Sequence, residues 1–394
     1  MKKNMWQFEN VEQYLETAME KIKKTAVRMN GMLPGYYHDD RGEWRAFSPG
    51  GWTDSFFPGM LYLSYLKSKA PFFLESARSY DQAFTDLLEN NKGKLDHDLG
   101  FLYTLKDVFD YQISGSEAAR TRALCAAEEL VRRYNPVAKI IPAWDFHPMQ
   151  PEVDYRGRII ADTMLNLPLL CWAYTQTQDE RYYEAAFQHG QTAQSYLVRE
   201  DGSSFHVYDF EPETGKPLRG GTMQGYADDS CWSRGQAWVL YGFALLYKNT
   251  GHKPFLQTAM KAAAYFIEHT PAYGVPLWDF AVSGLNYAPW DSSAGAVAVC
   301  GLLEICRHLP EKEERNYYYQ NAVRMMYGLT ELCATLDTCN MEPLLLHGCG
   351  APAYRKGAEQ ILATDNPDIP TIFGDYYYME ALMRLADESV PLPW

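Results

Sequence analysis

The chain has 394 residues, of which 50 are acidic and 36 basic, and its formal net charge is −14 at pH 7. Duplex nucleic acid and anionic membrane surfaces are bound by faces rich in Lys and Arg, so this balance argues against both as partners. A hydrophobic share of 47% is ample for a core, and the length alone suggests two domains of ordinary size. The 29 Tyr, 18 Phe and 10 Trp suit either a large core or stacking against ring-shaped ligands.

The sequence lacks the features of a secreted or membrane-spanning protein. Its start leads into a charged amphipathic stretch rather than the apolar segment of a secretory signal, and no apolar run reaches the roughly 18 to 20 residues that span a bilayer. The eight cysteines are scattered without CxxC pairs, which argues against a zinc ribbon or a disulfide framework. We therefore expect reduced thiols and a cytoplasmic location. Nothing in the sequence predicts an oligomeric state.

Helical periodicity dominates the chain, and two kinds of helix alternate along it. One kind is charged and amphipathic, and the other is rich in aromatic and small residues, as expected of helices buried on most sides. In chain order, the amphipathic helices are expected at residues 11–29, 73–90, 116–134, 179–198, 253–269 and 313–336. Each precedes a buried helix, and these begin at Asp54, Asp98, Asp162, Ser233, Asp291 and Asp375.

Six hairpins, each with an amphipathic outer helix and a buried inner helix, are typical of an (α/α)6 toroid. We therefore predict an all-α fold in which residues 1–394 form one ring and a single domain. If the hairpins are parallel, all inner helices start at the same rim, where their free N–H groups and positive dipole ends converge. Such a rim favours an anionic ligand, and the longest connections, 135–160, 199–232, 270–290 and 339–373, all lead to it.

Two aspartates stand at the expected starts of neighbouring inner helices. Asp98 follows Asp96 and His97, and Asp162 follows the stretch 157–161. Either can be simply a helix N-cap, for which Asp is among the best residues. As a pair across one pocket they would suit glycosidic chemistry, in which one carboxyl donates a proton and the other orients water or stabilises charge. A helix N-terminus lowers the pKa of a carboxyl, so repulsion, burial or an acidic substrate would have to raise it again.

Tryptophans gather at or before the inner-helix starts. Each can either plug a gap between helices or stack on a sugar ring. They are Trp52, Trp144, Trp232, Trp238, Trp278 and Trp290.

Three further side chains near this rim suit a sugar acid. His206 lies in a short alternating stretch that predicts a hairpin strand, where it can also be structural. Gln224 and Arg234 supply hydrogen-bond donors, and Arg is suited to a bidentate contact with a carboxylate. Alternatively, Arg234 forms an ion pair with Asp228 or Asp229.

Motifs for other chemistries are absent from the sequence. It has no HExxH, two-His or clustered-Cys motif for a metal, and no GxSxG elbow or P-loop. The run from Asp96 to Asp98 has the residue types of a cation site, but adjacent side chains rarely point the same way. We therefore expect neither a metal nor a cofactor.

Four motifs occur in an order and spacing found in a known family. They are Asp96-His97-Asp98-Leu99-Gly100-Phe101, Gly157-Arg158-Ile159-Ile160 with Asp162 and Asn166-Leu167-Pro168-Leu169-Leu170, Trp232-Ser233-Arg234-Gly235-Gln236-Ala237-Trp238, and Gly374-Asp375-Tyr376-Tyr377-Tyr378. Together they resemble the unsaturated glucuronyl hydrolases of glycoside hydrolase family 88, from about residue 52 to 385.

The resemblance implies an (α/α)6 barrel that removes a terminal 4-deoxy-hex-4-enuronic acid from oligosaccharides left by polysaccharide lyases, with no metal. Family members hydrate the C4=C5 double bond: a proton goes to C4, water adds at C5, and the resulting hemiketal opens and expels the neighbouring sugar. Asp162 matches the general acid/base of the family, and Asp98 matches its second essential carboxylate.

The resemblance also assigns a substrate pocket. His206, Gln224 and Arg234 match the subsite that holds the uronate. The matches to the aromatic walls are Trp52, Trp144 and Trp238. The expected partner is thus an oligosaccharide with an unsaturated uronate at its end.

In one stretch the chain departs from part of the family. Members that act on sulfated disaccharides carry the pattern Ser-x-x-Ser-x-Lys before the last inner helix. At these positions this chain has Ala351, Tyr354 and Lys356. The absence of both serines weakens the expectation of sulfate recognition. It leaves fragments of unsulfated chondroitin, hyaluronan, gellan, xanthan or heparin as substrates.

Three other functions stay open at this point. An unsaturated rhamnogalacturonyl hydrolase has a related barrel and the same hydration chemistry, but its motifs fit less well. A sugar 2-epimerase uses paired histidines where the inner-helix starts here carry acids. A non-catalytic glycan-binding toroid would bind the sugar without releasing a product.

Overall fold

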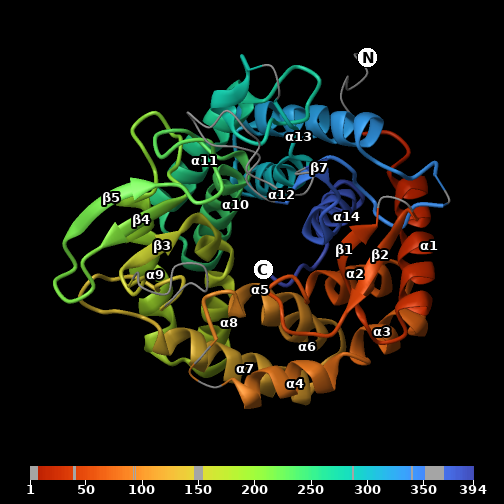
Figure 1. Cartoon of the computed structure of the whole chain (residues 1–394), viewed down its shortest axis with the longest axis horizontal. Coiled ribbons are helices and arrows are strands. Elements are labelled where there is room, and N and C mark those ends of the chain that lie inside the picture. Colours follow the sequence, from red (N-terminus) through yellow and green to blue (C-terminus); the bar gives the residue numbers. More distant parts are fainter. Residues whose placement is uncertain are drawn as a thin grey trace.

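The chain forms a ring of helices in a computed structural model (Figure 1). The structure describes residues 8–38, 41–91, 93, 95–145, 154–285, 288–338, 340–350 and 368–394. Amphipathic helices lie around the circumference and buried helices line the centre. The predicted all-α toroid is therefore confirmed.

The outer layer follows the predicted amphipathic segments. Its helices are α1 (Val11–Met29), α3 (Pro71–Arg78), α4 (Asp81–Asn90), α7 (Glu117–Arg132), α9 (Glu180–Tyr196), α11 (Lys253–His269) and α13 (Lys312–Leu332). The single helix predicted for residues 73–90 is wrong, because α3 and α4 are separated at Ser79 and Tyr80. Tyr80 is buried, and its hydroxyl donates to the carbonyl of Met32 (3.0 Å). The break between α3 and α4 is therefore bonded to the connection that follows α1.

The inner layer consists of α2 (Phe56–Ser68), α5 (Leu99–Tyr103), α6 (Phe109–Ser114), α8 (Leu167–Thr177), α10 (Ser233–Thr250), α12 (Ser292–His308) and α14 (Ile372–Ala386). A π-helical segment, η1 (Thr104–Val108), joins α5 to α6 in one continuous run, and a 3-10 turn, η2 (Ala161–Leu165), precedes α8. The π segment places Lys106 and Asp107 in the interior, where Lys106 pairs with Asp81 and Asp107 with Arg122. These two buried charges are thus each paired with an opposite charge.

Short strands occur between the helices. The hairpin of β1 (Leu33–His38) and β2 (Glu43–Phe47) is antiparallel, as are the pairs β3 (Arg158–Ile160) with β4 (Val207–Phe210), β4 with β5 (Pro217–Gly221), and β6 (Gly348–Cys349) with β7 (Asp368–Ile369). The strand predicted around His206 is confirmed: β4 begins at Val207, the residue after His206. The backbone of His206 bonds to Ala161 (2.9 Å) and Gly221 (3.1 Å), which links the sheet to the start of an inner helix.

Two glycines allow close approach of inner helices. A Cβ on Gly100 of α5 would lie 2.2 Å from Cα of Asn166, immediately before α8, and a Cβ on Gly59 of α2 would lie 2.8 Å from the ring of Tyr376 on α14. Contacts this short exclude any side chain. The second contact closes the ring, since α14 and α2 lie at opposite ends of the sequence (Figure 1).

A buried cluster of charges and aromatic rings joins three of the inner helices. Arg384 of α14 donates to Glu304 of α12 (2.8 Å), to Glu380 (2.9 Å) and to the hydroxyl of Tyr241 on α10 (2.6 Å). The indole of Trp394 donates to Glu380 (2.7 Å). Arg384 and Glu304 lie toward the C-terminal ends of α14 and α12, whereas Tyr241 and Glu380 lie near the middle of α10 and α14.

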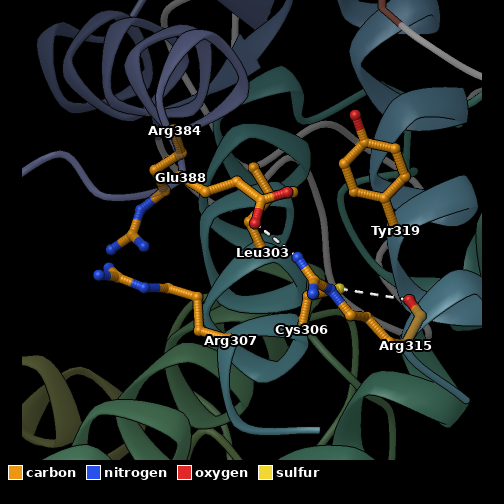
Figure 2. Close-up of a pocket in the computed structure, with 7 residues that line it drawn as sticks. All are labelled: Leu303, Cys306, Arg307, Arg315, Tyr319, Arg384 and Glu388. Atoms are coloured by element: carbon orange, nitrogen blue, oxygen red, sulfur yellow. Dashed lines mark hydrogen bonds and ion pairs between the residues drawn. The ribbon is translucent and has the colours of Figure 1, made fainter. Parts of the chain in front are cut away.

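A small pocket lies beside this cluster (Figure 2). It lies between the ends of α12 and α14 and the start of α13, and an ion pair between Arg315 and Glu388 spans it. Its lining carries no pair of free carboxyl groups, which distinguishes it from the opposite rim.

Among the described residues, no helix combines the length and the apolar character needed to cross a bilayer. The seven described cysteines are all free thiols.

Candidate functional site

The first turns of the inner helices meet at one rim. Trp52, just before α2, stacks on Phe373 of α14 with ring centroids 5.3 Å apart, and it also contacts Phe101 of α5 at 5.7 Å. The backbone N–H of Phe101 donates to Oδ1 of Asn166, before α8 (2.6 Å). Four inner-helix starts are thus in direct contact.

Arg234 connects the remaining two. It stands in the first turn of α10, and its Nη1 donates to Oδ2 of Asp291 at the start of α12 (2.6 Å). Its guanidinium also lies 5.1 Å from the ring of Phe373 on α14. The predicted convergence of all six inner-helix starts is therefore present.

The aspartates at this rim have different structural roles. Asp291 caps α12 by accepting the N–H of Ala294 (3.2 Å). The predicted helix start at Asp375 is wrong, because Thr371 caps α14 and Asp375 instead accepts the backbone N–H groups of Leu344 and Leu345.

Asp98 and Asp162 do not cap their helices. Asp98 occupies the N-cap position of α5 without a side-chain cap hydrogen bond, and Asp162 lies inside the 3-10 turn η2, whose N-cap is Ile160. The alternative that they are simple helix caps is therefore wrong for both side chains. Their carboxyl groups are available for another role.

Asp98 is held at one carboxyl oxygen. Its Oδ1 accepts from Nδ2 of Asn166 (3.3 Å) and lies 3.6 Å from Nε2 of His97, while 13% of the side chain is exposed. Burial, and then the neighbouring carboxylates of Asp96 and Asp162, raise the pKa of Asp98 well above its ordinary value.

Asp162 faces a histidine. Its Oδ2 lies 3.6 Å from Nε2 of His206, and its side chain is likewise 13% exposed. Burial acts to raise the pKa of Asp162, but the imidazole of His206, with His97 and Arg234 beyond it, outweighs burial and holds the pKa below its ordinary value.

The two carboxyl groups are close enough to influence each other. The charge of Asp162 is one of the causes that raise the pKa of Asp98, and the Nδ2 of Asn166 joins Oδ1 of Asp98 (3.3 Å) to the backbone carbonyl of Asp162 (3.3 Å). Because the pKa of Asp98 is raised and that of Asp162 lowered, the unliganded pair holds a proton on Asp98 in preference to Asp162. Repulsion and burial thus overcome the helix N-terminus at Asp98.

The tautomer of His206 follows from its hydrogen bonds. Its Nδ1 accepts the backbone N–H groups of Met223 (3.2 Å) and Gln224 (3.2 Å), so the ring proton is on Nε2, the atom that faces Asp162. The ring packs against Trp232 with centroids 4.4 Å apart.

Arg234 is buried and oriented by several acceptors. Besides Asp291, its Nη1 donates to the carbonyl of Cys349 (2.7 Å), and its Nη2 donates to Oε1 of Gln224 (3.0 Å). Because Oε1 is the acceptor, the amide NH₂ of Gln224 is left as a donor beside the guanidinium. The alternative pairing of Arg234 with Asp228 or Asp229 is wrong, because Asp291 takes that place.

The three predicted wall residues differ in exposure. Trp52 and Trp144 are partly exposed at the rim, and Trp144 meets the ring of His97 edge-on at 5.9 Å. Trp238 is fully buried between Phe101 and Tyr377, so it presents no face to solvent here. Only the first two offer a surface on which a sugar ring can stack in this conformation.

Sequence reasoning named His97 and Asn166 in motifs but assigned neither of them a role beside Asp98. His97 and Asn166 are fully buried, and burial lowers the pKa of His97 to about 4 despite the nearby carboxylates. Asn166 follows Asp162 by four residues, the spacing of one helical turn, which was the available signal.

Within the described ranges, no group of three or more His, Cys, Asp or Glu side chains is arranged to hold a metal ion. The stretch with Ala351, Tyr354 and Lys356 lies outside the described residues.

This arrangement suits proton transfer to a small anionic ring. Two carboxyl groups of opposite pKa shift lie in one site with a buried Arg234, and the partly exposed Trp52 and Trp144 lie at its edge. One carboxyl group can supply a proton while the other is ionised.

Comparisons with known proteins agree with this chemistry. The model of a family described as Glycosyl Hydrolase Family 88 matches residues 22–270. The unsaturated glucuronyl hydrolase of Bacillus sp. (strain GL1) is 39% identical over 335 residues, covering 85% of this chain and 86% of that protein. The unsaturated chondroitin disaccharide hydrolase of Streptococcus pneumoniae (strain ATCC BAA-255 / R6) is 37% identical over 335 residues, covering 84% and 81%.

The fold agrees as well. A crystal structure of unsaturated glucuronyl hydrolase from Bacillus sp. GL1 superimposes with a TM-score of 0.89 at 35% identity, covering 98% of this chain and 99% of that one.

Proposed function

Because the chain belongs to glycosyl hydrolase family 88 and is therefore a glycosidase, we propose that it removes the terminal unsaturated glucuronyl residue from oligosaccharides produced by polysaccharide lyases. One observation carries this proposal: Asp98 and Asp162 lie in one site, with pKa values moved in opposite directions, beside the buried Arg234. The names of the relatives support the same activity.

The substrate carboxylate binds at Arg234 in this proposal. The guanidinium and the amide NH₂ of Gln224 form a pair of donors, and the N-terminal ends of the inner helices favour negative charge. The ring of the sugar lies against Trp52 and Trp144, with Trp238 beneath. His206 completes the subsite through its Nε2–H.

The reaction is a hydration of the C4=C5 double bond. Asp162 donates a proton to C4 and then accepts a proton from the water that adds to C5, while Asp98 binds the substrate and stabilises the developing charge. The hemiketal that forms at C5 opens and expels the neighbouring sugar. A positioned acid is needed, because an alkene carbon is a weak base.

The bound uronate favours the protonated form of Asp162, and the proton comes from the one that the pair of aspartates already holds. In this structure the pKa of Asp162 is below its ordinary value, so it holds a proton less readily than Asp98 does. A second carboxylate nearby disfavours the ionised form, and the ring also shields Asp162 from water. Both effects raise the pKa of Asp162 once substrate is in place.

Two finer properties also follow as proposals. The residues Ala351 and Tyr354 replace the serines found in members that act on sulfated disaccharides, so we propose a preference for unsulfated fragments. The free thiols of the described cysteines support a cytoplasmic location, where oligosaccharides would arrive after uptake.

The test mixes the purified protein with a panel of lyase-generated disaccharides and follows the ultraviolet absorbance of the C4=C5 double bond of the unsaturated uronate (the enoate). We expect loss of absorbance, with stoichiometric release of a reducing sugar, from unsulfated unsaturated glucuronyl disaccharides. Turnover of only an unsaturated rhamnogalacturonyl disaccharide would favour that neighbouring activity instead. Tight binding without any product would favour a glycan-binding toroid.

A further inference from the structure

His97 is a buried histidine with one nitrogen aimed at Asp98. The side chain is 1% exposed, and Nε2 lies 3.6 Å from Oδ1 of Asp98. No hydrogen-bond partner for this nitrogen exists among the described residues. A buried imidazole N–H without a partner costs free energy, so its presence here calls for an explanation.

The other nitrogen of the ring is held by donors. Nδ1 lies 2.9 Å from the hydroxyl of Thr163 and 3.4 Å from Nδ2 of Asn166. The orientation of that amide is determined, because its Oδ1 accepts the backbone N–H of Phe101 (2.6 Å). Its Nδ2 is therefore the donor that faces Nδ1 of His97. The ring proton of His97 is consequently on Nε2, the atom next to Asp98.

The same arrangement occurs at the second carboxyl group. Backbone donors occupy Nδ1 of His206 and leave its Nε2–H facing Asp162 at 3.6 Å. Each aspartate thus faces one buried histidine whose tautomer is set by the hydrogen bonds at its Nδ1. The resemblance assigns a role to His206 but not to His97.

We propose that His97 is a positioning residue that holds Oδ1 of Asp98 and thereby directs Oδ2 at the substrate. Oδ1 accepts from Asn166 on one side and faces Nε2 of His97 at 3.6 Å on the other, and Oδ2 makes no hydrogen bond to any described residue. A small rotation of the Asp98 side chain brings Oδ1 into hydrogen-bond range of Nε2 when the site is occupied. This inference rests on the proposed function, since it concerns the geometry of that reaction.

The competing explanation is that His97 only fills space and supports the ring of Trp144. Two substitutions separate these explanations. His97→Asn retains an acceptor for Thr163 and Asn166 but has no group at the position of Nε2. His97→Gln retains a donor near the position of Nε2. Asn is one methylene group smaller than Gln, so the two variants also differ in packing, and the same pair of substitutions at another buried histidine has to control for that difference.

The experiment measures kcat and KM of both variants on the best disaccharide from the wild-type panel. We expect His97→Asn to lower kcat by at least about tenfold with KM changed less than threefold, and His97→Gln to recover most of kcat. Equal losses in both variants, or a loss confined to KM, would overturn the proposal. If the wild type turns over no disaccharide in the panel, that result contradicts the proposed function itself, independently of the role of His97.

Matched controls account for loss of packing. His189 is also a fully buried histidine, whose Nδ1 accepts the N–H of Ile141 (2.9 Å), and it lies on the outer helix α9. His189→Asn and His189→Gln should lower the melting temperature without the kcat difference. Should the His97 variants not fold, Thr163→Val keeps His97 and removes one donor to Nδ1. A two- to fivefold lower kcat at unchanged KM is then expected, and an unchanged kcat would contradict the proposal.

Discussion

Asp98 and Asp162 have the same side chain and the same exposed fraction, yet their pKa values move in opposite directions. The difference arises from their neighbours. Asp98 lies near the carboxylates of Asp96 and Asp162, whereas Asp162 lies near His206 and Arg234. One proton on the pair is therefore the expected state of the free site, and such coupled groups titrate as a unit.

This state predicts a bell-shaped pH profile of kcat/KM. The raised pKa of Asp98 means that the pair keeps one proton above the ordinary range of an aspartate, and activity falls when the pair loses the proton that Asp162 must deliver to C4. The lowered pKa of Asp162 means that the pair takes up a second proton only below that range, and the loss of the remaining carboxylate there sets the acid limb.

Asp96→Asn tests the cause of the alkaline limb. Asn retains an acceptor for the backbone N–H of Asp98, which Asp96 accepts at 3.0 Å, but removes a negative charge that raises the pKa of Asp98. We expect the alkaline limb to move to lower pH in a profile measured on the same disaccharide. A limb that stays in place would show that Asp96 does not set it.

Single residues were predictable only where a motif named them. Asp98, Asp162 and Arg234 are brought together as expected, but the partner of Arg234 is Asp291, which lies 57 residues away, rather than Asp228 or Asp229 nearby in sequence. Contacts across neighbouring helices follow from the fold and leave no mark in local sequence. His97 was noticed beside Asp98, but its tautomer depends on Thr163 and Asn166 from another helix.

At the scale of elements, the hydrophobic pattern predicted most helices well. The bounds of α1 and α11 agree with the predicted ranges, because their amphipathic faces end where a cap or a turn begins. Irregular segments were not predictable. The π segment η1 and the break between α3 and α4 depend on buried side chains such as Lys106 and Tyr80, whose tertiary partners override local propensity.

The helix junction at Gly100 gives a testable consequence for the site. Ala at this position would place Cβ 2.2 Å from Cα and 2.4 Å from the carbonyl oxygen of Asn166, which are backbone atoms that cannot rotate away. We expect Gly100→Ala to destabilise the fold by about 1 to 3 kcal/mol or more and to lower kcat, since the junction carries both Asp98 and Asn166.

Thermal unfolding and initial rates measure the two effects. Gly284→Ala is the control, because a Cβ at Gly284 meets nothing within 4 Å. A Gly100→Ala enzyme with wild-type melting temperature and kcat would show that the close approach is unnecessary.

At the scale of the whole molecule, the charge of −14 and an acidic substrate are compatible. In the proposed function the substrate is a single uronate that meets Arg234 and the helix N-termini locally, whereas a long polyanion would meet the whole acidic surface. The buried cluster around Arg384 joins the inner helices α10, α12 and α14 in the interior of the ring.

That the ring is one domain stays a proposal, and its unfolding tests it. The contact of Gly59 with Tyr376 joins the first inner helix to the last, so the ring should lose its structure cooperatively. We expect far-ultraviolet circular dichroism and tryptophan fluorescence to report one coincident transition. Two separated transitions would indicate two domains.

The central claim is that Asp98 and Asp162 together catalyse the removal of an unsaturated uronate. Its most direct test compares the wild type with Asp98→Asn and Asp162→Asn by the loss of enoate absorbance, after calorimetry has shown that each variant still binds the disaccharide. The account predicts that kcat falls by about 10² to 10⁴ in each variant while binding is retained. Wild-type turnover in either variant would contradict it.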